Sequence, residues 1–589
     1  MKLLLDPRKG DIEDDASSTR QRSLLSLAGS LMAEISPVKL VLAWVLLIGL
    51  PGLVLGSLPL IISLWFGKLS TQVSLVLAGL GSLVALGVLL LLAWLGWRKV
   101  WSMFETSFWS LHALGLQPSY VVGREVIRHV AERRLGQSYN PRRRSVIRSV
   151  SGLVSAAILS VLAAWVAFIA WPHTRWTASL ADLAVPFQFL LPVIANAILV
   201  VSSYFSVAAL VWGVADAWMM APQDIPSFAG QPVGGRLWHI AHLSDVHTVA
   251  GPYGFRIESG RSGPRGNQRL DRVLAELARR HARRPLDAIL LTGDLTDAGA
   301  ATEWAAFVDA LAPYPQLQTR MIALPGNHDL NVVDRANPAR LDLPGSPSQV
   351  LRQMRMLSVL AGLQGERLNV IDAETGHVGP TLAAYLAPHR DVIARFADSG
   401  SRRLGRELSA IADLAFPMLQ RPDGEAGLGI IVLNSNASTH FSFTNALGMV
   451  SMAQLRASER VMGQFPSAGW IIALHHHLVE YPIPAKALSE RIGTALINGS
   501  QVIRRLRKYS SRILFMHGHR HTEWIGSAGG IPIVSAPSPV MEASDTQPSH
   551  FFIHAVSTDT SGAIVLQQPE KVTIMGMDVP SDTGADPSM

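Results

Sequence analysis

The stretch Leu237-Trp-His-Ile-Ala-His-Leu-Ser-Asp-Val-His247 decides how the larger part of this 589-residue chain folds. Its first seven residues are mostly apolar and predict a buried strand, and the polar group Asp245-Val246-His247 follows close behind. Four further polar clusters each directly follow an apolar run of the same kind. They are Gly293-Asp294-Leu295-Thr296-Asp297, Gly326-Asn327-His328-Asp329, His475-His476-His477 and Gly518-His519-Arg520-His521.

Oxygen donors and imidazoles at successive strand ends converge on one edge of a sheet, which predicts a metal centre built from distant parts of the chain. The chain has no cysteine, so the available donors are Asp, Asn and His. Such a set suits borderline-hard divalent ions such as Mn, Fe, Zn or Ni better than a thiolate-type structural zinc site. The donors exceed the needs of one ion. Two ions about 3.5 to 4 Å apart that share a carboxylate would use them all.

In their order along the chain, the five clusters resemble the signature of the calcineurin-like metallophosphoesterases, which is DxH, GDxxD, GNH(D/E), H and GHxH. The resemblance covers roughly residues 236–568 and implies a four-layer α/β/β/α sandwich that carries two divalent ions. It implies that one ion is bound by Asp245, His247, Asp294 and His521. It implies that the other is bound by Asp294, Asn327, His476 and His519, with Asp294 as the bridge.

The fourth motif leaves a choice, because three histidines stand in a row. In the family the ligand usually lies two residues before a proline, and this chain has Leu478 where that proline would be. We expect His476 to be the ligand, with His475 as the alternative. The resemblance also implies that His328 acts near the leaving group as a proton donor or charge stabiliser and that Asp329 orients it.

Polar residues of the domain outside these roles are expected to be structural. Asp297 should cap a loop or a backbone amide rather than bind metal. Four other histidines have no motif partner and are expected to be structural or surface residues. They are His239, His242, His440 and His517.

The first third of the chain predicts an all-α membrane region. Hydrophobic residues make up 49% of the chain and charged residues only 16%, and the apolar excess lies in this part. Four runs are long and apolar enough to cross a bilayer as helices. They are residues 40–66, 73–97, 153–171 and 186 to about 214. The alternative, buried helices of a water-soluble core, is disfavoured by uncharged stretches of this length.

Many of the arginines behind the net charge of +7 lie between the second and third runs, in residues 98–150. Cationic loops stay on the cytoplasmic side of a membrane, so we expect this basic loop and both chain termini in the cytoplasm. The same arginines could also bind anionic lipid headgroups. Because membrane topology explains the charge, no nucleic-acid partner is expected.

These patterns divide the chain into five segments. They are a cytoplasmic leader (1–36), the transmembrane region (37–215), a Pro- and Gly-rich linker (216–235), the metallophosphoesterase domain (236–570) and a disordered polar tail (571–589). Within the domain, short strands alternate with amphipathic helices, which is typical of an α/β fold. The long interval between Asp329 and Trp470 is expected to hold insertions that shape the substrate site.

The sequence therefore predicts a phosphoester hydrolase anchored in the inner (cytoplasmic) membrane by several spans, with its dimetal site in the cytoplasm. The GNHD form and the serial histidines resemble the phosphodiesterase branch of the family, while membrane attachment makes a lipid-linked phosphoester the rival substrate. A membrane sensor that binds a phosphorylated ligand without turnover is the alternative from another class. No ligand position is lost, which favours catalysis. A transporter is disfavoured because the apolar runs hold no internal ionisable residue.

Overall fold

The computed structural model describes residues 3–5, 45, 49–76, 116–135, 141–178, 188, 190–218, 222–225 and 227–229, and, with short gaps, 236–479 and 496–576. The chain forms two compact units. One unit comprises residues 36–219 together with 485–492, and the other comprises 1–35, 220–484 and 493–589.

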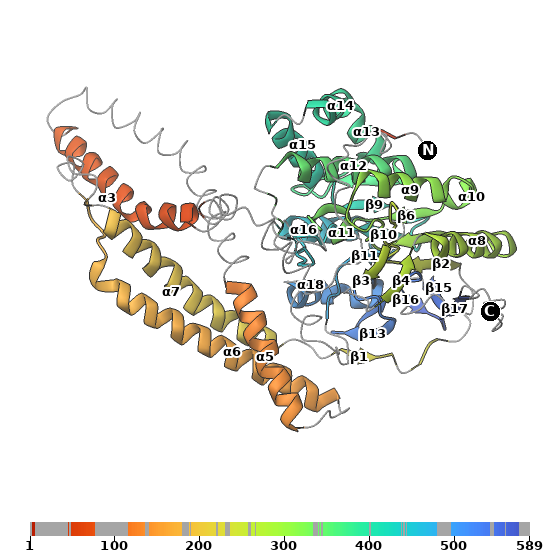
Figure 1. The fold of residues 1–589 in the computed structure, drawn as a ribbon, viewed down its shortest axis with the longest axis horizontal. Helices are drawn as coiled ribbons and strands as arrows, with labels where there is room; N and C mark the ends of the chain where they lie inside the picture. The colour runs from red at the N-terminus through yellow and green to blue at the C-terminus, as the bar shows by residue number, and fades with distance from the viewer. Residues whose placement is uncertain are drawn as a thin grey trace, which may run out of the picture. The chain divides into compact units, whose positions relative to one another are not determined.

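The first unit is helical. Its described elements are α3 (Leu50–Val76), α5 (Gln117–Leu135), α6 (Pro141–Ala170), the short 3-10 helix η5 (Trp171–His173) and α7 (Leu190–Ala217) (Figure 1). Helices α6 and α7 pack along each other, and α3 packs on α7. Small residues permit this close approach, because a Cβ atom on Gly56 would stand only 2.2 Å from the carbonyl oxygen of Val193.

In the described part of this unit, three helices are long and apolar enough to cross a membrane, where the sequence predicts four spans. They are Leu50–Lys68, Ser145–His173 and Leu190–Ala217. The predicted run at 73–97 enters α3 with its first four residues and otherwise lies outside the described part of the chain. The predicted basic loop at 98–150 is helical where it is described, because it contains α5 and the beginning of α6.

The second unit is an α/β domain with two mixed sheets (Figure 1). The nine-stranded sheet has the order β1-β13-β14-β12-β11-β10-β9-β7-β8. Its strands are β1 (Gln223–Asp224), β7 (Asn369–Ile371), β8 (Val378–Thr381), β9 (Met418–Gln420), β10 (Leu428–Val432), β11 (Gly469–Ala473), β12 (Ile513–His517), β13 (Trp524–Ala528) and β14 (Ile531–Ser535).

The six-stranded sheet has the order β16-β15-β2-β5-β6, with β17 paired to β15. Its strands are β2 (Leu237–Leu243), β5 (Ala288–Leu291), β6 (Met321–Ala323), β15 (Ser549–Thr558), β16 (Ile564–Leu566) and β17 (Glu570–Ile574). A separate hairpin joins β3 (Tyr253–Arg256) and β4 (Arg261–Arg265). Strands β2, β5 and β6 run parallel, as do β10, β11, β12 and β14. Parallel strands bring their carboxyl ends to one edge.

Helices cover the sheets. They are α8 (Gln268–Arg283), α9 (Ala301–Leu311), α10 (Pro315–Gln318), α11 (Asn327–Leu330), α12 (Pro347–Gln364), α13 (Leu382–Leu386), α14 (Arg390–Ser399), α15 (Arg402–Leu414), α16 (Met452–Gln464) and α18 (Gly499–Leu506). The interval after Asp329 thus holds a group of helices, α12 to α15, that pack on one another.

Alternate side chains of β11 enter two different cores. Ile471 and Ala473 join a core that also contains the six-stranded sheet, α8, α9 and α12. Trp470 and Ile472 join a second core with α16 and α18. This alternation follows from the two-residue period of a strand. Both faces of the nine-stranded sheet are therefore covered, which explains the nearly continuous apolar sequence of its central strands.

Two segments predicted to lie outside the metallophosphoesterase domain contact it through their described residues. In the predicted leader, the backbone N–H groups of Leu4 and Leu5 donate to Ser358 Oγ on α12 at 2.8 and 2.7 Å. The predicted tail at 571–589 begins too early, because β17 pairs with β15 and buries Val572 and Ile574. The predicted linker likewise contains β1, which pairs with β13. Residues 1–2 and 6–36 of the leader and 577–589 of the tail lie outside the described part of the chain.

Candidate metal centre

The backbone at the candidate site is held in a conformation that side-chain-bearing residues rarely adopt. Among the described residues, five that are not glycine have positive φ, between 40° and 74°. They are Asp245, His247, Asp294, His519 and His521. Such residues cost about 1–3 kcal/mol each and persist where the surrounding structure enforces them, typically at functional sites. All five belong to the clusters that follow β2, β5 and β12.

Hydrogen bonds between these turns fix their relative positions. The backbone N–H of Asp245 donates to the carbonyl oxygen of Gly293 at 3.0 Å, and that of His247 donates to Asp294 at 2.9 Å. The N–H of His519 donates to Asp245 Oδ2 at 3.0 Å. The ends of strands from both sheets are thereby joined into one edge.

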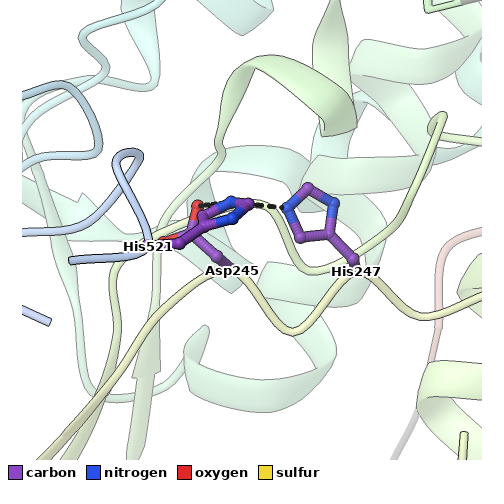
Figure 2. A group of neighbouring side chains, drawn as sticks. All are labelled: Asp245, His247 and His521. Atoms are coloured by element: carbon purple, nitrogen blue, oxygen red, sulfur yellow. Dashed lines mark hydrogen bonds and ion pairs between the residues drawn. The ribbon is translucent and has the colours of Figure 1, made fainter. Parts of the chain in front are cut away.

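A first donor group consists of Asp245, His247 and His521 (Figure 2). The Nε2 atoms of His247 and His521 lie 3.2 Å apart, and His521 Nε2 lies 3.4 Å from Asp245 Oδ1. That carboxylate oxygen is buried and accepts no hydrogen bond from the described residues. A buried anionic oxygen that faces two imidazole nitrogens is costly alone and fits a bound cation.

A second donor group consists of Asp294, His475 and His519. His475 Nε2 lies 3.3 Å from Asp294 Oδ2, 3.1 Å from His519 Nδ1 and 3.1 Å from Asn327 Oδ1. The same Asp294 Oδ2 lies 3.7 Å from His247 Nε2, in the first group. One carboxylate thus stands between the two groups, which is the geometry expected of a bridging ligand.

Burial and neighbouring charges shift the pKa values of two side chains at this edge, Asp294 and His475. Burial alone raises the pKa of the Asp294 carboxyl, but charge on His475 and His328 and their hydrogen bonds hold it below its ordinary value. Burial opposes protonation of His475, but the attraction of Asp294 raises the pKa of this imidazole to about 9. A bound cation would take the place of the proton that these two groups share.

His476 lies outside both donor groups, whereas His475, the alternative ligand, lies inside the second one. His476 Nδ1 lies 2.9 Å from Ser435 Oγ, which also accepts the backbone N–H groups of His475 and His476 at 3.2 Å. A hydroxyl that accepts two bonds donates its own hydrogen to the third partner, so His476 Nδ1 is the acceptor. The third histidine, His477, stacks on His519 at 5.8 Å.

His328 lies beside the first group, with its ring 4.7 Å from that of His247. Its Nδ1 lies 2.6 Å from the carbonyl oxygen of Asp297, and its backbone N–H donates to Asp294 Oδ1 at 2.8 Å. The Asp297 carboxylate lies 3.3 Å from His247 Nδ1. Asp297, which the sequence predicted to be a loop cap, therefore contacts two histidines of the edge.

The described hydrogen bonds of the Asp329 carboxylate are to backbone N–H groups and to the Thr296 hydroxyl, not to His328. Its carboxylate accepts the N–H groups of Gly326, Leu295 and Thr296 at 2.8, 3.2 and 2.9 Å, and the Thr296 hydroxyl at 2.7 Å. Burial and the nearby Asp294 charge raise the pKa of Asp329 to about 6. Asp329 thus connects the GDxxD turn to the GNHD turn.

Sequence reasoning missed two residues that contact the site. Ser435 lies three residues after the end of β10 and contacts His476, as described above. Asn445 Oδ1 lies 3.5 Å from Asn327 Nδ2, and its carbonyl oxygen accepts Asn331 Nδ2 at 2.6 Å. The contact between Asn445 Oδ1 and Asn327 Nδ2 turns the oxygen of the Asn327 amide towards His475. Neither residue belongs to a motif, so only their contacts reveal them.

Comparison with known proteins agrees with the motif pattern. Residues 239–373 match the family of calcineurin-like phosphoesterases. A dimetal phosphatase from Danio rerio is 14% identical, with 58% of this chain and 99% of that chain covered and a TM-score of 0.32. A Staphylococcus aureus protein described as a 5'-nucleotidase, in complex with α-ketoglutarate, is 14% identical, with 58% and 55% covered and a TM-score of 0.30. No curated protein matches the chain. The two structural similarities are too low to bear on activity.

Proposed function

We propose that this chain is a metal-dependent phosphoester hydrolase with two divalent ions, drawn from Mn, Fe, Zn and Ni. The position of Asp294 between the two donor groups carries the proposal, because a shared carboxylate is what a two-metal centre requires. The first ion is held by Asp245, His247, Asp294 and His521. The second is held by Asp294, Asn327, His475 and His519.

The side chains around the ions have separate roles. When bound, the two ions supply a hydroxide nucleophile at neutral pH and neutralise charge on the phosphoryl oxygens. His328 donates Nδ1–H to the Asp297 carbonyl, so its Nε2 is the atom left to meet the leaving oxygen. There it stabilises or protonates the departing alkoxide when the imidazole carries a second proton. Asp329 contributes by holding the two turns that carry Asp294 and Asn327.

The substrate class we propose is a phosphodiester, because the GNHD form and the serial histidines resemble the phosphodiesterase branch of the family. A lipid-linked phosphoester is the rival, since the same chain carries membrane-length helices. A panel of four substrates distinguishes them: bis-aryl phosphate, a 3',5'-cyclic nucleotide, an aryl monophosphate and a phospholipid. Turnover of the first two alone supports the phosphodiesterase. If none is hydrolysed by metal-loaded protein, the hydrolase proposal fails, and saturable binding without turnover then indicates a sensor.

We also propose that the protein is a multi-pass protein of the inner membrane with four spans and a cytoplasmic catalytic domain. The bonds from Leu4 and Leu5 to Ser358 support it, because they require residue 5 and the catalytic domain to lie on one side of the membrane. The number of crossings between them is then even. Three candidate spans are described, so the apolar run at 73–97 is the natural fourth.

The absence of cysteine makes this topology testable with single cysteines and a membrane-impermeant maleimide. With four spans, Lys68→Cys and Thr174→Cys react in intact cells, whereas Arg134→Cys reacts only after lysis. Reaction of the cysteines at 68 and 134 from the same side would contradict four spans.

The two cores that flank the nine-stranded sheet further support a four-layer α/β/β/α order for the domain.

A further inference from the structure

Helix α5 of the first unit has its polar side turned inward. Arg124 and Glu125 are buried, and they pair with each other at 2.8 Å. Arg124 also pairs with Asp216 of α7 at 2.8 Å. The same aspartate accepts the Tyr120 hydroxyl at 2.9 Å and pairs with Arg148 of α6 at 3.1 Å. The charges of α5 thus form a network between three helices rather than a surface that faces water.

The opposite face of α5 is uncovered and carries a row of valines, with His129 exposed beside them. Val122, Val126 and Val130 recur every four residues, so they lie in one row along the helix. Each is more than 40% exposed. Val146 and Val150, in the first turns of α6, are exposed as well. A helix in water places its charges outside and its valines inside, whereas α5 buries Arg124 and Glu125 and exposes three valines.

The depth of α5 in a bilayer follows from its contact with α6, a candidate membrane span. Ser155 Oγ donates to the carbonyl oxygen of Tyr120 at 3.0 Å. Ser155 lies ten residues into the candidate span Ser145–His173, which is about 15 Å along the helix. That span has 29 residues, or about 43 Å, whereas the hydrocarbon core of a bilayer is about 30 Å thick. If α6 crosses the bilayer, Tyr120 therefore lies several ångströms inside the hydrocarbon.

The C-terminal end of α5 is polar. Arg133 and Arg134, in its last turn, are exposed. They follow Val126 by about 10 to 12 Å along the axis, enough to pass from the acyl chains to the headgroups. Cationic side chains are favoured at that level by anionic lipids.

We propose that the valine face of α5 is a lipid-contact surface, embedded in the leaflet with the helix C-terminus at the headgroups. Its occupant is the acyl chains, because the face is continuous with the exposed apolar side of α6. This assignment rests on the membrane anchoring proposed above. Under this proposal, residues 117–130 of the predicted basic loop form a membrane-embedded part of α5.

Spin labels at single cysteines test this surface in the full chain reconstituted into vesicles of phosphatidylcholine and phosphatidylglycerol. The positions are Val126→Cys on the valine face, Arg134→Cys at the polar end and Val161→Cys on α6, where Val161 is 68% exposed. We expect the label at 126 to show stronger relaxation by oxygen and weaker relaxation by a water-soluble nickel chelate than the label at 134, and the label at 161, near the middle of its span, to be the least accessible to nickel. The label at 134 should show a several-fold greater response to nickel.

Each other outcome has a distinct meaning. A nickel response at 126 equal to that at 134 overturns the lipid contact. Weak responses at 126 to both agents show that protein covers the face, and dipolar coupling between labels then identifies a second copy as that protein. A strong nickel response at 161 overturns the membrane anchoring itself, so failure of the anchor is distinguishable from failure of this inference. An unchanged gel-filtration profile in detergent confirms that each variant folds.

Discussion

Replacement of His475 by alanine should remove one ion from the protein, whereas replacement of His476 should not. His475 Nε2 lies 3.1 Å from Asn327 Oδ1 and 3.3 Å from Asp294 Oδ2, so it is one of four proposed ligands of the second ion. Loss of an outer-shell contact typically costs about 10–100-fold in metal affinity. Loss of a ligand should cost at least about 100-fold, which is about 2.8 kcal/mol.

The matched variant His476→Ala removes a ring of the same size from the next position. It loses the hydrogen bond to Ser435 and leaves both ligand sets complete. Its metal affinity should fall by less than that of the His475 variant, within the range of about 10–100-fold for loss of an outer-shell contact. Metal content after dialysis, calorimetric titration of the apoprotein and turnover of bis-aryl phosphate give three independent measures.

The reverse pattern would refute the ligand assignment. If the His475 variant keeps two tightly bound ions while the His476 variant loses one, the second ion is held by the residue that the sequence first suggested. Thermal unfolding of both apoproteins serves as the control, because both rings are fully buried and each alanine leaves a cavity. A stability loss common to both variants does not explain a difference in metal content.

Four further predictions follow from the contacts. Asp294→Asn should cut turnover by orders of magnitude while circular dichroism stays unchanged, because only the bridging charge is lost. Asn445→Ala should lower metal affinity about tenfold by freeing the amide of Asn327, as measured by calorimetry. Burial lowers the pKa of His554 to about 3, so the unfolded chain gains a proton there as pH falls below 6.5 and folding stability declines down to about pH 3. His554→Phe should therefore reduce the acid slope of unfolding by about 1.4 kcal/mol per pH unit. Asp216→Asn should destabilise the helical unit by about 3 kcal/mol, seen as a lower melting temperature in detergent, because two buried arginines lose a charged partner.

Much of the catalytic domain was predictable because its signals are local. Apolar runs of strand length precede the five clusters, and the structure has β2, β5, β6, β11 and β12 at those places. Parallel pairing then requires their polar ends to share one edge. The ordered contacts at residues 3–5 and at β17 were not predictable, because they depend on a partner surface, α12 or β15, far away in the sequence.

The helical unit shows the same division. Length and apolarity indicated candidate spans, and three such helices are present in the described part of the chain. The arginines of 98–150 indicated a cytoplasmic loop, but composition does not record which side of a helix a charge occupies. Only the packing of α5 on α6 and α7 turned Arg124 inward, towards Asp216.

By itself, the sequence determined which residue types end the strands, and hence that Asp, Asn and His donors meet at one edge. The tertiary structure decided which of three consecutive histidines faces that edge. Neighbouring side chains point in different directions once β11 ends, and Ser435, just beyond the end of the adjacent strand β10, engages His476 and leaves His475 to face Asp294. Such a choice depends on contacts across the sheet. The order of residues along the chain does not contain it.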